Sequence, residues 1–230
     1  MPRRAPFIVI EGLDRSGKTT QTSLLHAHLE SLGIPVKLLK FPDRTTAIGK
    51  MIDSYLRSQS ELDDHAIHLL FSANRWELAS TITTLLNSGT AILCDRYAFS
   101  GIAFSASKPS LQHTFPTTQN DALPWCRSPD ISLPAPDLTI FLDITPEQAK
   151  LRGGYGEERY EKEGMQKRVR EVFYRLGEEM STGDDVKKWF VLDAGRERQV
   201  VAEELWKLVE PLTRGIDEKI RRLWEDKLSC

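Results

Sequence analysis

The sequence predicts one α/β domain with a five-stranded parallel sheet covered by helices on both faces. Three observations support this prediction. Five short apolar runs indicate buried strands, and they alternate with longer segments whose apolar residues recur at helical spacing. A Gly-x4-Gly-Lys-Thr loop follows the first run and opens a helix. No internal repeat or linker divides the 230 residues, so we expect a single domain over 1–230.

The composition is typical of a globular protein, with 40% hydrophobic and 28% charged residues. A net charge of -2 gives no electrostatic reason to expect a nucleic-acid or membrane-surface partner. No apolar run is long enough to span a bilayer, and the run after Arg4 is too short for a signal peptide. Cys94, Cys126 and Cys230 form no C-x-x-C pair, which favours a reducing compartment. We expect a cytoplasmic location and leave entry into the nucleus open.

The first apolar run, 7–10, predicts a buried strand that leads into the phosphate-binding loop at 12–19. Glycines let the backbone curl so that its N–H groups point at phosphate oxygens, and the following helix adds its positive end. Lys18 is expected to hold the β- and γ-phosphates, and the Thr19 hydroxyl to ligate Mg²⁺. The alternative is a glycine-rich turn that binds nothing, which the strand before and the helix after disfavour.

The later elements continue the alternation of strands and helices. Asp63 or Asp64 can cap the long third helix. Ile216, Ile220, Leu223 and Trp224 recur at helical spacing and predict a helix that packs on the domain, a partner-binding face being the alternative. In chain order we expect helix 17–32, strand 36–40, helices 45–58 and 62–87, strand 91–94, helix 98–106, a long loop 107–136, strand 138–142, helices 146–152 and 159–180, strand 188–192, and a helical tail from 197 broken at Pro211.

Polar residues follow the second and third strands, at the sheet edge where ligands of open parallel sheets gather. Asp95 can serve a metal directly or through water, and Arg96 can hold a phosphate. The alternative for this pair is a simple ion pair at a strand end. Arg44 would complete a two-arginine clamp for a monophosphate, although taken alone it is typical of an exposed charge at a helix start.

Two further segments have weaker signals. Phe71 and Arg75 share one face of the long helix and could stack a base and donate to its carbonyl; spacing alone favours a core Phe beside a surface Arg. His65 and His68 share that helix without a third ligand, so we propose no metal there. Glycines between Arg152 and Arg159 predict a flexible lid, near 152–160, that excludes water from transferring phosphates.

Together these segments resemble the thymidylate kinase family of P-loop nucleoside monophosphate kinases, and most closely its eukaryotic branch. The resemblance covers most of the chain from Phe7 to Asp193 in order. It extends past the widely shared phosphate loop to motifs that are specific to the family. The motifs are EGLDRSGKT at 11–19, FP-x-R at 41–44, LFSANRWE at 70–77, DRYAFSG at 95–101, PDL at 136–138 and ERYE at 158–161.

The resemblance implies an ATP- and Mg²⁺-dependent kinase that converts dTMP to dTDP, and a homodimer. It implies Arg15, Lys18, Asp95 and Arg96 as catalytic residues, with Thr19 and Asp95 at the metal. The implied donor-site residues are Gly12, Asp14, Arg15, Ser16, Gly17, Lys18, Thr19, Thr20 and Arg152, the last against adenine. The implied acceptor-site residues are Asp14 near the sugar or phosphate, Arg44 and Arg96 at the phosphate, Phe71 and Arg75 at thymine, and Gly101, Phe104 and Tyr160 beside sugar and base, together with Phe41.

Arg15 is the most telling of these positions, because the family divides by whether a basic residue lies in the phosphate loop or in the lid. Here it lies in the loop, where it would act as an arginine finger worth on the order of 10³ to 10⁵ in rate. One departure is a loop near 105–125 that is longer than the family pattern, which leaves the contacts of Phe104 open.

Two other functions remain alternatives. The first is a kinase for another nucleoside monophosphate or a nucleoside. The second is a nucleotide-dependent switch or binding module without an acceptor. The guanine-reading Asn/Thr-Lys-x-Asp signature is absent, which counts against a GTP switch.

Overall fold

A five-stranded sheet with the order β2-β3-β1-β4-β5 forms the centre of the protein, and all its strand pairs are parallel. This computed structural model describes residues 3–112, 121–152, 159–160, 162–181 and 188–228. The predicted fold class is confirmed, including all five strands. The strands are β1 (Phe7–Gly12), β2 (Val36–Lys40), β3 (Ala91–Asp95), β4 (Leu138–Asp143) and β5 (Trp189–Asp193).

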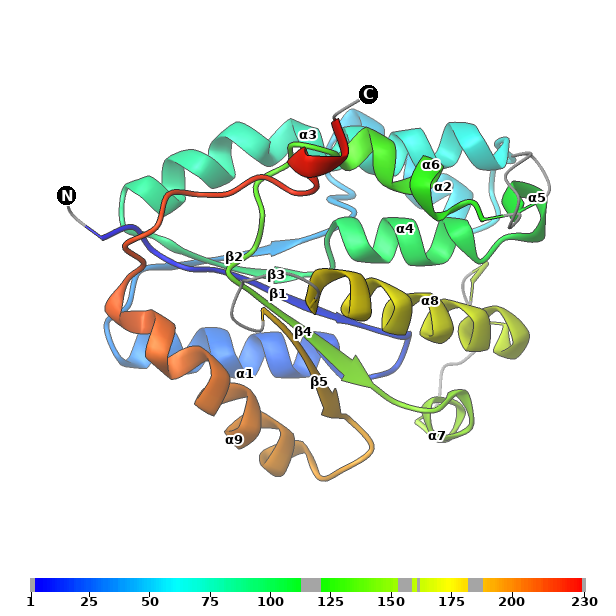
Figure 1. Ribbon diagram of the computed structural model, residues 1–230. Helices are drawn as coiled ribbons and strands as arrows, with labels where there is room; N and C mark the ends of the chain where they lie inside the picture. The colour runs from blue at the N-terminus through cyan, green and yellow to red at the C-terminus, as the bar shows by residue number, and fades with distance from the viewer. Residues whose placement is uncertain (1–2, 113–120, 153–158, 161, 182–187, 229–230) are drawn as a thin grey trace.

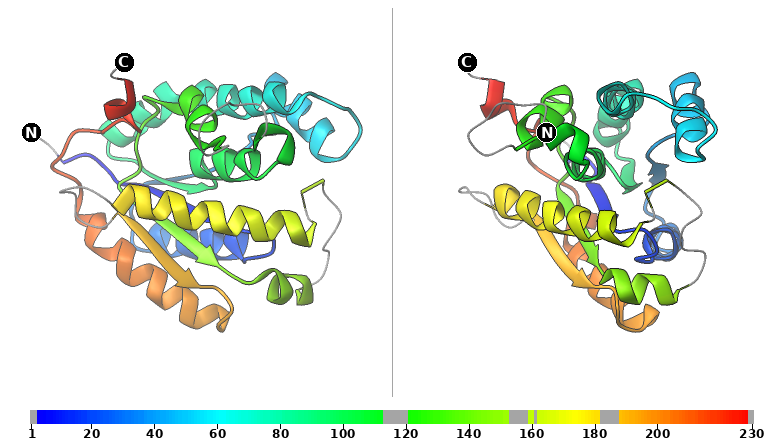
Figure 2. Two further views of the ribbon diagram at one scale, coloured as in Figure 1. Left: turned by 45° about the vertical axis from the view of Figure 1, so that its right-hand side comes forward. Right: turned by 90° about the vertical axis from the view of Figure 1, so that its right-hand side faces the viewer.

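Helices cover both faces of the sheet (Figure 1). On one face α1 and α9 lie side by side, and on the other α3, α4 and α8 lie against the strands, with α2 outside α3 (Figure 2). The helices are α1 (Lys18–Ser31), α2 (Ala47–Leu56), α3 (Asp64–Asn87), α4 (Ala98–Ala106), α5 (Pro109–Gln112), α6 (Leu123–Arg127), α7 (Pro146–Leu151), α8 (Glu163–Ser181) and α9 (Arg198–Val209), with 3-10 turns η1 (Ser128–Asp130), η2 (Glu210–Arg214) and η3 (Glu225–Leu228). Of the two candidates for the cap of α3, Asp63 is the one that forms it, because its side chain accepts from the His65 N–H.

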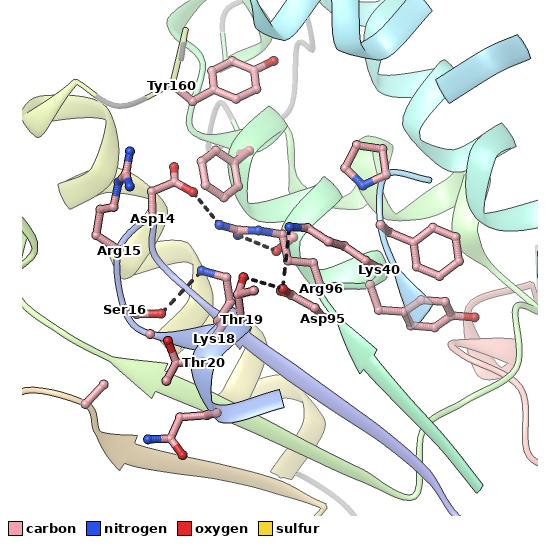
Figure 3. Close-up of a pocket in the computed structure, with 18 of the residues that line it drawn as sticks. Asp14, Arg15, Ser16, Lys18, Thr19, Thr20, Lys40, Asp95, Arg96 and Tyr160 are labelled. Atoms are coloured by element: carbon pink, nitrogen blue, oxygen red, sulfur yellow. Dashed lines mark hydrogen bonds and ion pairs between the residues drawn. The ribbon is translucent and has the colours of Figure 1, made fainter. Parts of the chain in front are cut away.

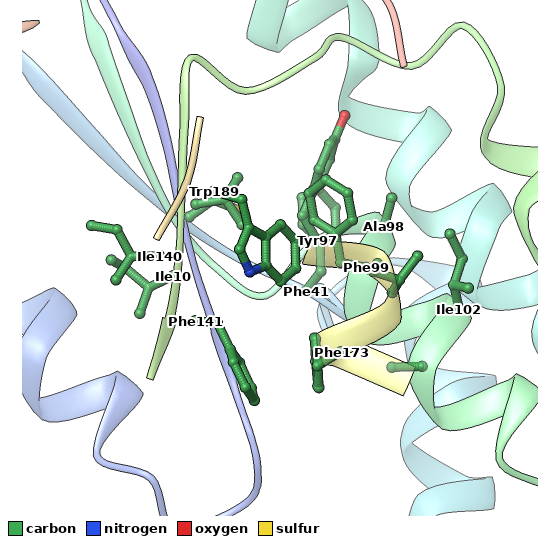
Figure 4. Packing of buried hydrophobic residues seen from close by; sticks show 14 of the residues in the cluster. Ile10, Phe41, Tyr97, Ala98, Phe99, Ile102, Ile140, Phe141, Phe173 and Trp189 are labelled. Atoms are coloured by element: carbon green, nitrogen blue, oxygen red, sulfur yellow. The ribbon is translucent and has the colours of Figure 1, made fainter. Parts of the chain in front are cut away.

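One large hydrophobic core includes residues of the sheet and of the helices on both of its faces. Phe141 of β4 stacks on Phe173 of α8 with ring centroids 4.7 Å apart, and Phe99 of α4 meets Trp189 of β5 edge-on at 5.0 Å (Figure 4). The central strands are buried on both faces, which is why their sequences are nearly continuous apolar runs without alternation. In the part of the chain that the structure describes, no helix combines the length and apolar character needed to cross a membrane.

Two predicted segments are wrong. The loop expected over 107–136 contains α5, α6 and η1, because one or two helical turns are too short to show a period. The helix expected from Ile216 to Trp224 is irregular: Gly215 turns with φ of 88°, and Ile216 pairs with Arg4 in an isolated bridge. Leu223 and Trp224 are nevertheless buried in the core, so the apolar stripe reflects burial and its helical spacing is coincidental.

Smaller differences concern element ends. Helix α8 begins at Glu163 and not at Arg159, and α2 spans fewer residues than expected. Strand β3 includes Asp95, so the strand itself delivers this carboxylate to the sheet edge. Most of the predicted lid (153–158) and part of the extended loop (113–120) lie outside the described residues.

Candidate active site

A cavity of about 600 Å³ opens at the carboxyl edge of the sheet, above β1, β2 and β3. The site residues expected from the sequence are far apart in the chain. All of them except Gly12 line this one cavity, from the phosphate loop to Arg152 and the aromatic residues Phe71, Phe104 and Tyr160. At Gly12 a Cβ would approach the Leu142 carbonyl to 2.7 Å, so no side chain fits at this position.

The phosphate loop holds Lys18 beneath the curled backbone. Its Nζ donates to the Leu13 carbonyl at 2.5 Å and lies 3.4 Å from Ser16 Oγ (Figure 3). Burial, and then the charge of Arg96, lowers the pKa of Lys18 to about 7. The loop therefore concentrates donors and positive charge around Lys18, whose ammonium forms no ion pair with the described residues, and this suits a phosphate group.

Thr19 and Asp95 meet beside this loop. The Thr19 hydroxyl donates to Asp95 Oδ2 at 3.0 Å, and Lys40 Nζ lies 4.0 Å from the same oxygen. Asp95 Oδ1 is buried without a hydrogen-bond partner among the described residues. An oriented hydroxyl next to an unsatisfied carboxylate oxygen is a hard-oxygen set of the kind that Mg²⁺ prefers, so these residues fit the expected metal.

Arg96 and Asp14 join the end of β3 to the phosphate loop. Arg96 Nη2 lies 2.5 Å from Asp14 Oδ1, while Nη1 donates to the Gly12 carbonyl at 2.9 Å and to Ser100 Oγ at 3.1 Å. Its guanidinium also lies 5.3 Å above the Phe104 ring, on the side expected for an acceptor. The strand-end alternative, an ion pair between Asp95 and Arg96, is wrong, because the carboxylate that Arg96 meets is Asp14.

Glu11 is a residue of this site that sequence reasoning missed. Its buried carboxylate accepts from the Tyr97 N–H at 2.9 Å, the Ser100 N–H at 3.1 Å and the Ser100 hydroxyl. Burial raises its pKa, and the hydrogen bonds and Arg96 oppose that shift. Glu11 thus fixes the start of α4 next to Arg96. A lone Glu at the end of the apolar run 7–10 was the available signal, since a buried carboxylate requires partners.

Gln166 of α8 was missed as well. Its Nε2 donates to Asp14 Oδ2 at 2.8 Å and to the Tyr160 carbonyl at 2.9 Å, and its Oε1 accepts from the Asp14 N–H at 3.2 Å. One buried amide therefore connects the phosphate loop to the end of the lid segment. No local motif indicates this, because all three contacts depend on how α8 packs.

The loop that carries Arg44 is positioned by Asn74 of α3. Asn74 Oδ1 accepts from the Asp43 N–H at 2.7 Å, and its Nδ2 donates to the Asp43 carbonyl at 3.2 Å. Arg44 Nη1 in turn lies 2.6 Å from Asp53 of α2. Phe41, earlier in the loop, is buried with its ring 5.7 Å from that of Tyr97. The loop thus presents Arg44 at the cavity edge, held from both α2 and α3.

Phe71 and Arg75 both line the cavity from α3. The interpretation favoured by spacing alone, a core Phe beside a surface Arg, is wrong for Arg75. Its side chain is only 2% exposed and forms a two-pronged ion pair with Asp130, which is fully buried. Asp130 was not among the expected site residues.

His68, on the same helix, engages Ser105 and the Cys126 carbonyl with its two ring nitrogens, and burial lowers its pKa to about 3.

The two described ends of the lid segment are anchored to different parts of the site. Arg152 donates to the carbonyls of Arg15 in the phosphate loop, at 3.1 Å, and of Ala194 after β5. Arg159 lies 2.7 Å from Glu61 and 4.2 Å above the Tyr55 ring, so it is held by the α2–α3 connection.

The neighbouring Tyr160 ring lies 5.5 Å from that of Phe104. The cavity thus has a phosphate-binding half and an aromatic half, with Asp14 and Arg96 between them. This arrangement can hold two phosphate-bearing molecules end to end.

Known proteins resemble the chain over nearly its whole length. The family described as Thymidylate kinase matches residues 10–205. The thymidylate kinase of Schizosaccharomyces pombe is 50% identical over 206 residues, which cover 90% of this chain and 92% of that protein. The human thymidylate kinase is 41% identical over 224 residues, covering 97% and 99%. A solved structure of thymidylate kinase from Candida albicans has a TM-score of 0.83 at 39% identity and covers 96% of this chain and 99% of that one.

Proposed function

The chain belongs to the thymidylate kinase family and phosphorylates dTMP to dTDP, and from this premise we propose which of its residues carry out the transfer. Family membership implies ATP as the phosphoryl donor. The observation that supports the assignment is that the phosphate loop, the Arg96–Asp14 pair and the Phe71–Arg75 face line one cavity. A donor and an acceptor could therefore meet phosphate to phosphate at the edge of the sheet.

ATP is assigned to the half of the cavity formed by the phosphate loop. Backbone N–H groups of 12–20, including those of Ser16, Gly17 and Thr20, would surround its phosphates, and Lys18 would reach the β- and γ-groups. The Arg152 guanidinium, held between two carbonyls at the cavity edge, would lie against adenine. Thr19 and Asp95 would hold Mg²⁺, which when bound neutralises phosphate charge.

dTMP is assigned to the aromatic half. Phe71 would stack on thymine, and Arg75 would donate to its ring carbonyl. Arg44 and Arg96, presented by two strand ends, would hold the 5′-phosphate. Asp14 would meet the sugar or the phosphate region. The remaining contacts to sugar and base are assigned to Phe41, Gly101, Phe104 and Tyr160.

In the transfer, an oxygen of the dTMP phosphate attacks the γ-phosphorus of ATP in line, and the bond to the β–γ bridging oxygen breaks to release ADP. No covalent enzyme intermediate is needed, because positioning and charge stabilisation suffice. Arg15 rises from the phosphate loop beside Asp14, on the side where the acceptor would lie (Figure 3). We assign it to the charge that develops on the transferring phosphoryl group. The lid segment between Arg152 and Arg159 would exclude water, so that ATP is not hydrolysed.

Assembly and location are also proposals. Leu69 and Trp76 of α3, seven residues apart and thus on one helix face, are 49% and 40% exposed, which supports a homodimer through this face. Sedimentation of the protein and of a Leu69→Glu variant tests it, and a monomeric parent protein would refute it.

The buried free thiols of Cys94 and Cys126 support a cytoplasmic location, which fractionation tests.

An acceptor panel tests the assignment of the two sites. ADP release is measured with dTMP, dUMP, dCMP, AMP and GMP at fixed ATP. We expect a clear preference for dTMP and little ADP release without an acceptor. Equal rates with all five acceptors would contradict the acceptor site, and equal ADP release without any acceptor would indicate a hydrolase or switch.

A further inference from the structure

We propose that Asp130 is a positioning residue that sets base selectivity, because it holds Arg75 in one orientation, in which the guanidinium can donate to a carbonyl of the base but not to an amino group. This proposal rests on the proposed function of Arg75. It adds a residue that lies 55 positions away in the chain and is out of reach of the cavity itself.

The geometry leaves only part of the guanidinium available. Arg75 Nε donates to Asp130 Oδ1 at 3.0 Å, and Nη2 donates to Oδ2 at 2.6 Å. Its Nη1 has no hydrogen-bond partner among the residues that the structure describes, and Arg75 lines the cavity. A planar fork that is held by two bonds cannot rotate without breaking both, so the direction of Nη1 is fixed.

Asp130 is itself held in place. Ser72 Oγ lies 2.8 Å from Asp130 Oδ1 and 2.9 Å from the carbonyl of Pro129. The Trp76 indole N–H donates to the same carbonyl at 2.8 Å. Ser72 and Trp76 of α3 therefore fix η1 and its carboxylate. The carboxylate in turn determines how Arg75, on the same helix, presents its remaining N–H groups.

Gly101 of α4 limits the position of the Arg75 guanidinium from the other side. A Cβ on Gly101 of α4 would lie 2.7 Å from both Nη1 and Nη2 of Arg75. Any larger residue at 101 would displace the guanidinium from its pair with Asp130. Gly101 and Asp130 thus confine Arg75 between α4 and η1.

The confinement has a chemical consequence for the base. A guanidinium donates hydrogen bonds and accepts none. The 4-carbonyl of thymine or uracil can accept from Nη1, whereas the 4-amino group of cytosine would place donor against donor. A site whose donor has a fixed orientation rejects a base without the matching acceptor far more strongly than a site whose donor can rotate away. Asp130 therefore contributes to discrimination between keto and amino bases without touching the base.

The test compares Asp130→Asn with a matched control, Asp137→Asn. Asp137 also forms a two-pronged, mostly buried pair, with Nη1 and Nη2 of Arg4 at 2.7 and 2.6 Å, but at the opposite edge of the sheet. The values of kcat and KM are measured for dTMP and dCMP, together with Tm. We expect both variants to lower Tm. Only Asp130→Asn should raise the KM for dTMP and reduce the dTMP/dCMP ratio of kcat/KM, by about tenfold or more, with the KM for ATP unchanged.

The outcomes separate this proposal from the one it rests on. An unaltered dTMP/dCMP ratio in folded Asp130→Asn would overturn the role of Asp130 even if the unmodified protein prefers dTMP strongly. No preference in the unmodified protein would instead overturn the role of Arg75. Should Asp130→Asn fail to fold, Gly101→Ala is the second variant. It displaces the same guanidinium and is expected to reduce the ratio, and an unchanged ratio there also overturns the proposal.

Discussion

The hydroxyl of Thr19 donates a 3.0 Å hydrogen bond to Oδ2 of Asp95, joining the first turn of α1 to the end of β3 across 76 residues. The second oxygen of that carboxylate is buried and has no hydrogen-bond partner among the described residues. A buried acceptor of this kind is costly unless something with positive charge or a proton meets it. The pair therefore supports a cation beside the phosphates.

Asp95→Asn is expected to weaken the use of Mg²⁺. The change keeps the shape of the side chain but removes its charge, so kcat should fall by about 10² or more and half-maximal activity should need more Mg²⁺. Titration of activity with Mg²⁺ at saturating ATP and dTMP measures both effects. An Mg²⁺ dependence equal to that of the parent protein would exclude Asp95 from the metal site.

Arg15→Ala is expected to lower kcat by on the order of 10³ while the KM for dTMP changes only a few-fold. The reason is that the proposed interaction forms mainly in the transition state. Steady-state kinetics measure it, with Arg175→Ala as the control, since Arg175 is exposed and pairs with Asp121 outside the cavity. A kcat equal to that of the control would remove Arg15 from the transfer.

Phe71→Ala is expected to act on dTMP binding instead. Stacking of a base on an aromatic ring contributes about 1–3 kcal/mol, so the KM for dTMP should rise by about tenfold or more with a smaller effect on kcat. The KM for ATP, measured in the same assay, serves as the internal control. If the dTMP value stays constant, thymine does not lie on Phe71.

ATP binding is expected to take up a proton above pH 7. Burial and Arg96 lower the pKa of Lys18 to about 7 in the empty site, so its amine is largely neutral at pH 8. Bound phosphates favour the charged amine and raise that pKa again, so the protein gains a proton on binding. Calorimetry at pH 8 in buffers of different ionisation enthalpy measures this uptake. Lys18→Met should abolish it, and equal uptake in both proteins would assign the proton to another group.

Gln166→Met is expected to weaken acceptor use by about tenfold in kcat/KM for dTMP. The substitution preserves most of the buried volume but removes both hydrogen bonds to Asp14 and the one to Tyr160. Asp14 then loses a partner that orients it toward Arg96. The KM and kcat for dTMP measure the effect, and a change in Tm alone would show that Gln166 has only a structural role.

The sequence by itself determined the elements and motifs whose causes are local. Apolar runs of strand length act within a few residues, so the five strands were predictable. The glycine after α1 and the carboxylate that caps α3 are also local signals, and they indicate where a helix ends or begins. The residues of the phosphate loop were recognisable for the same reason, because the loop needs its glycines, Lys18 and Thr19 at fixed spacing.

Only the tertiary structure decided which polar side chains meet. Asp130 pairs with Arg75, Gln166 with Asp14 and Glu11 with the start of α4, each across dozens of residues. Such pairs replace the hydrogen bonds to water that buried polar groups have lost. The need for a partner arises only once packing has excluded water. Likewise Ile216 to Trp224 show helical spacing yet form no helix, because their partners, Arg4 and the core, lie elsewhere in the chain.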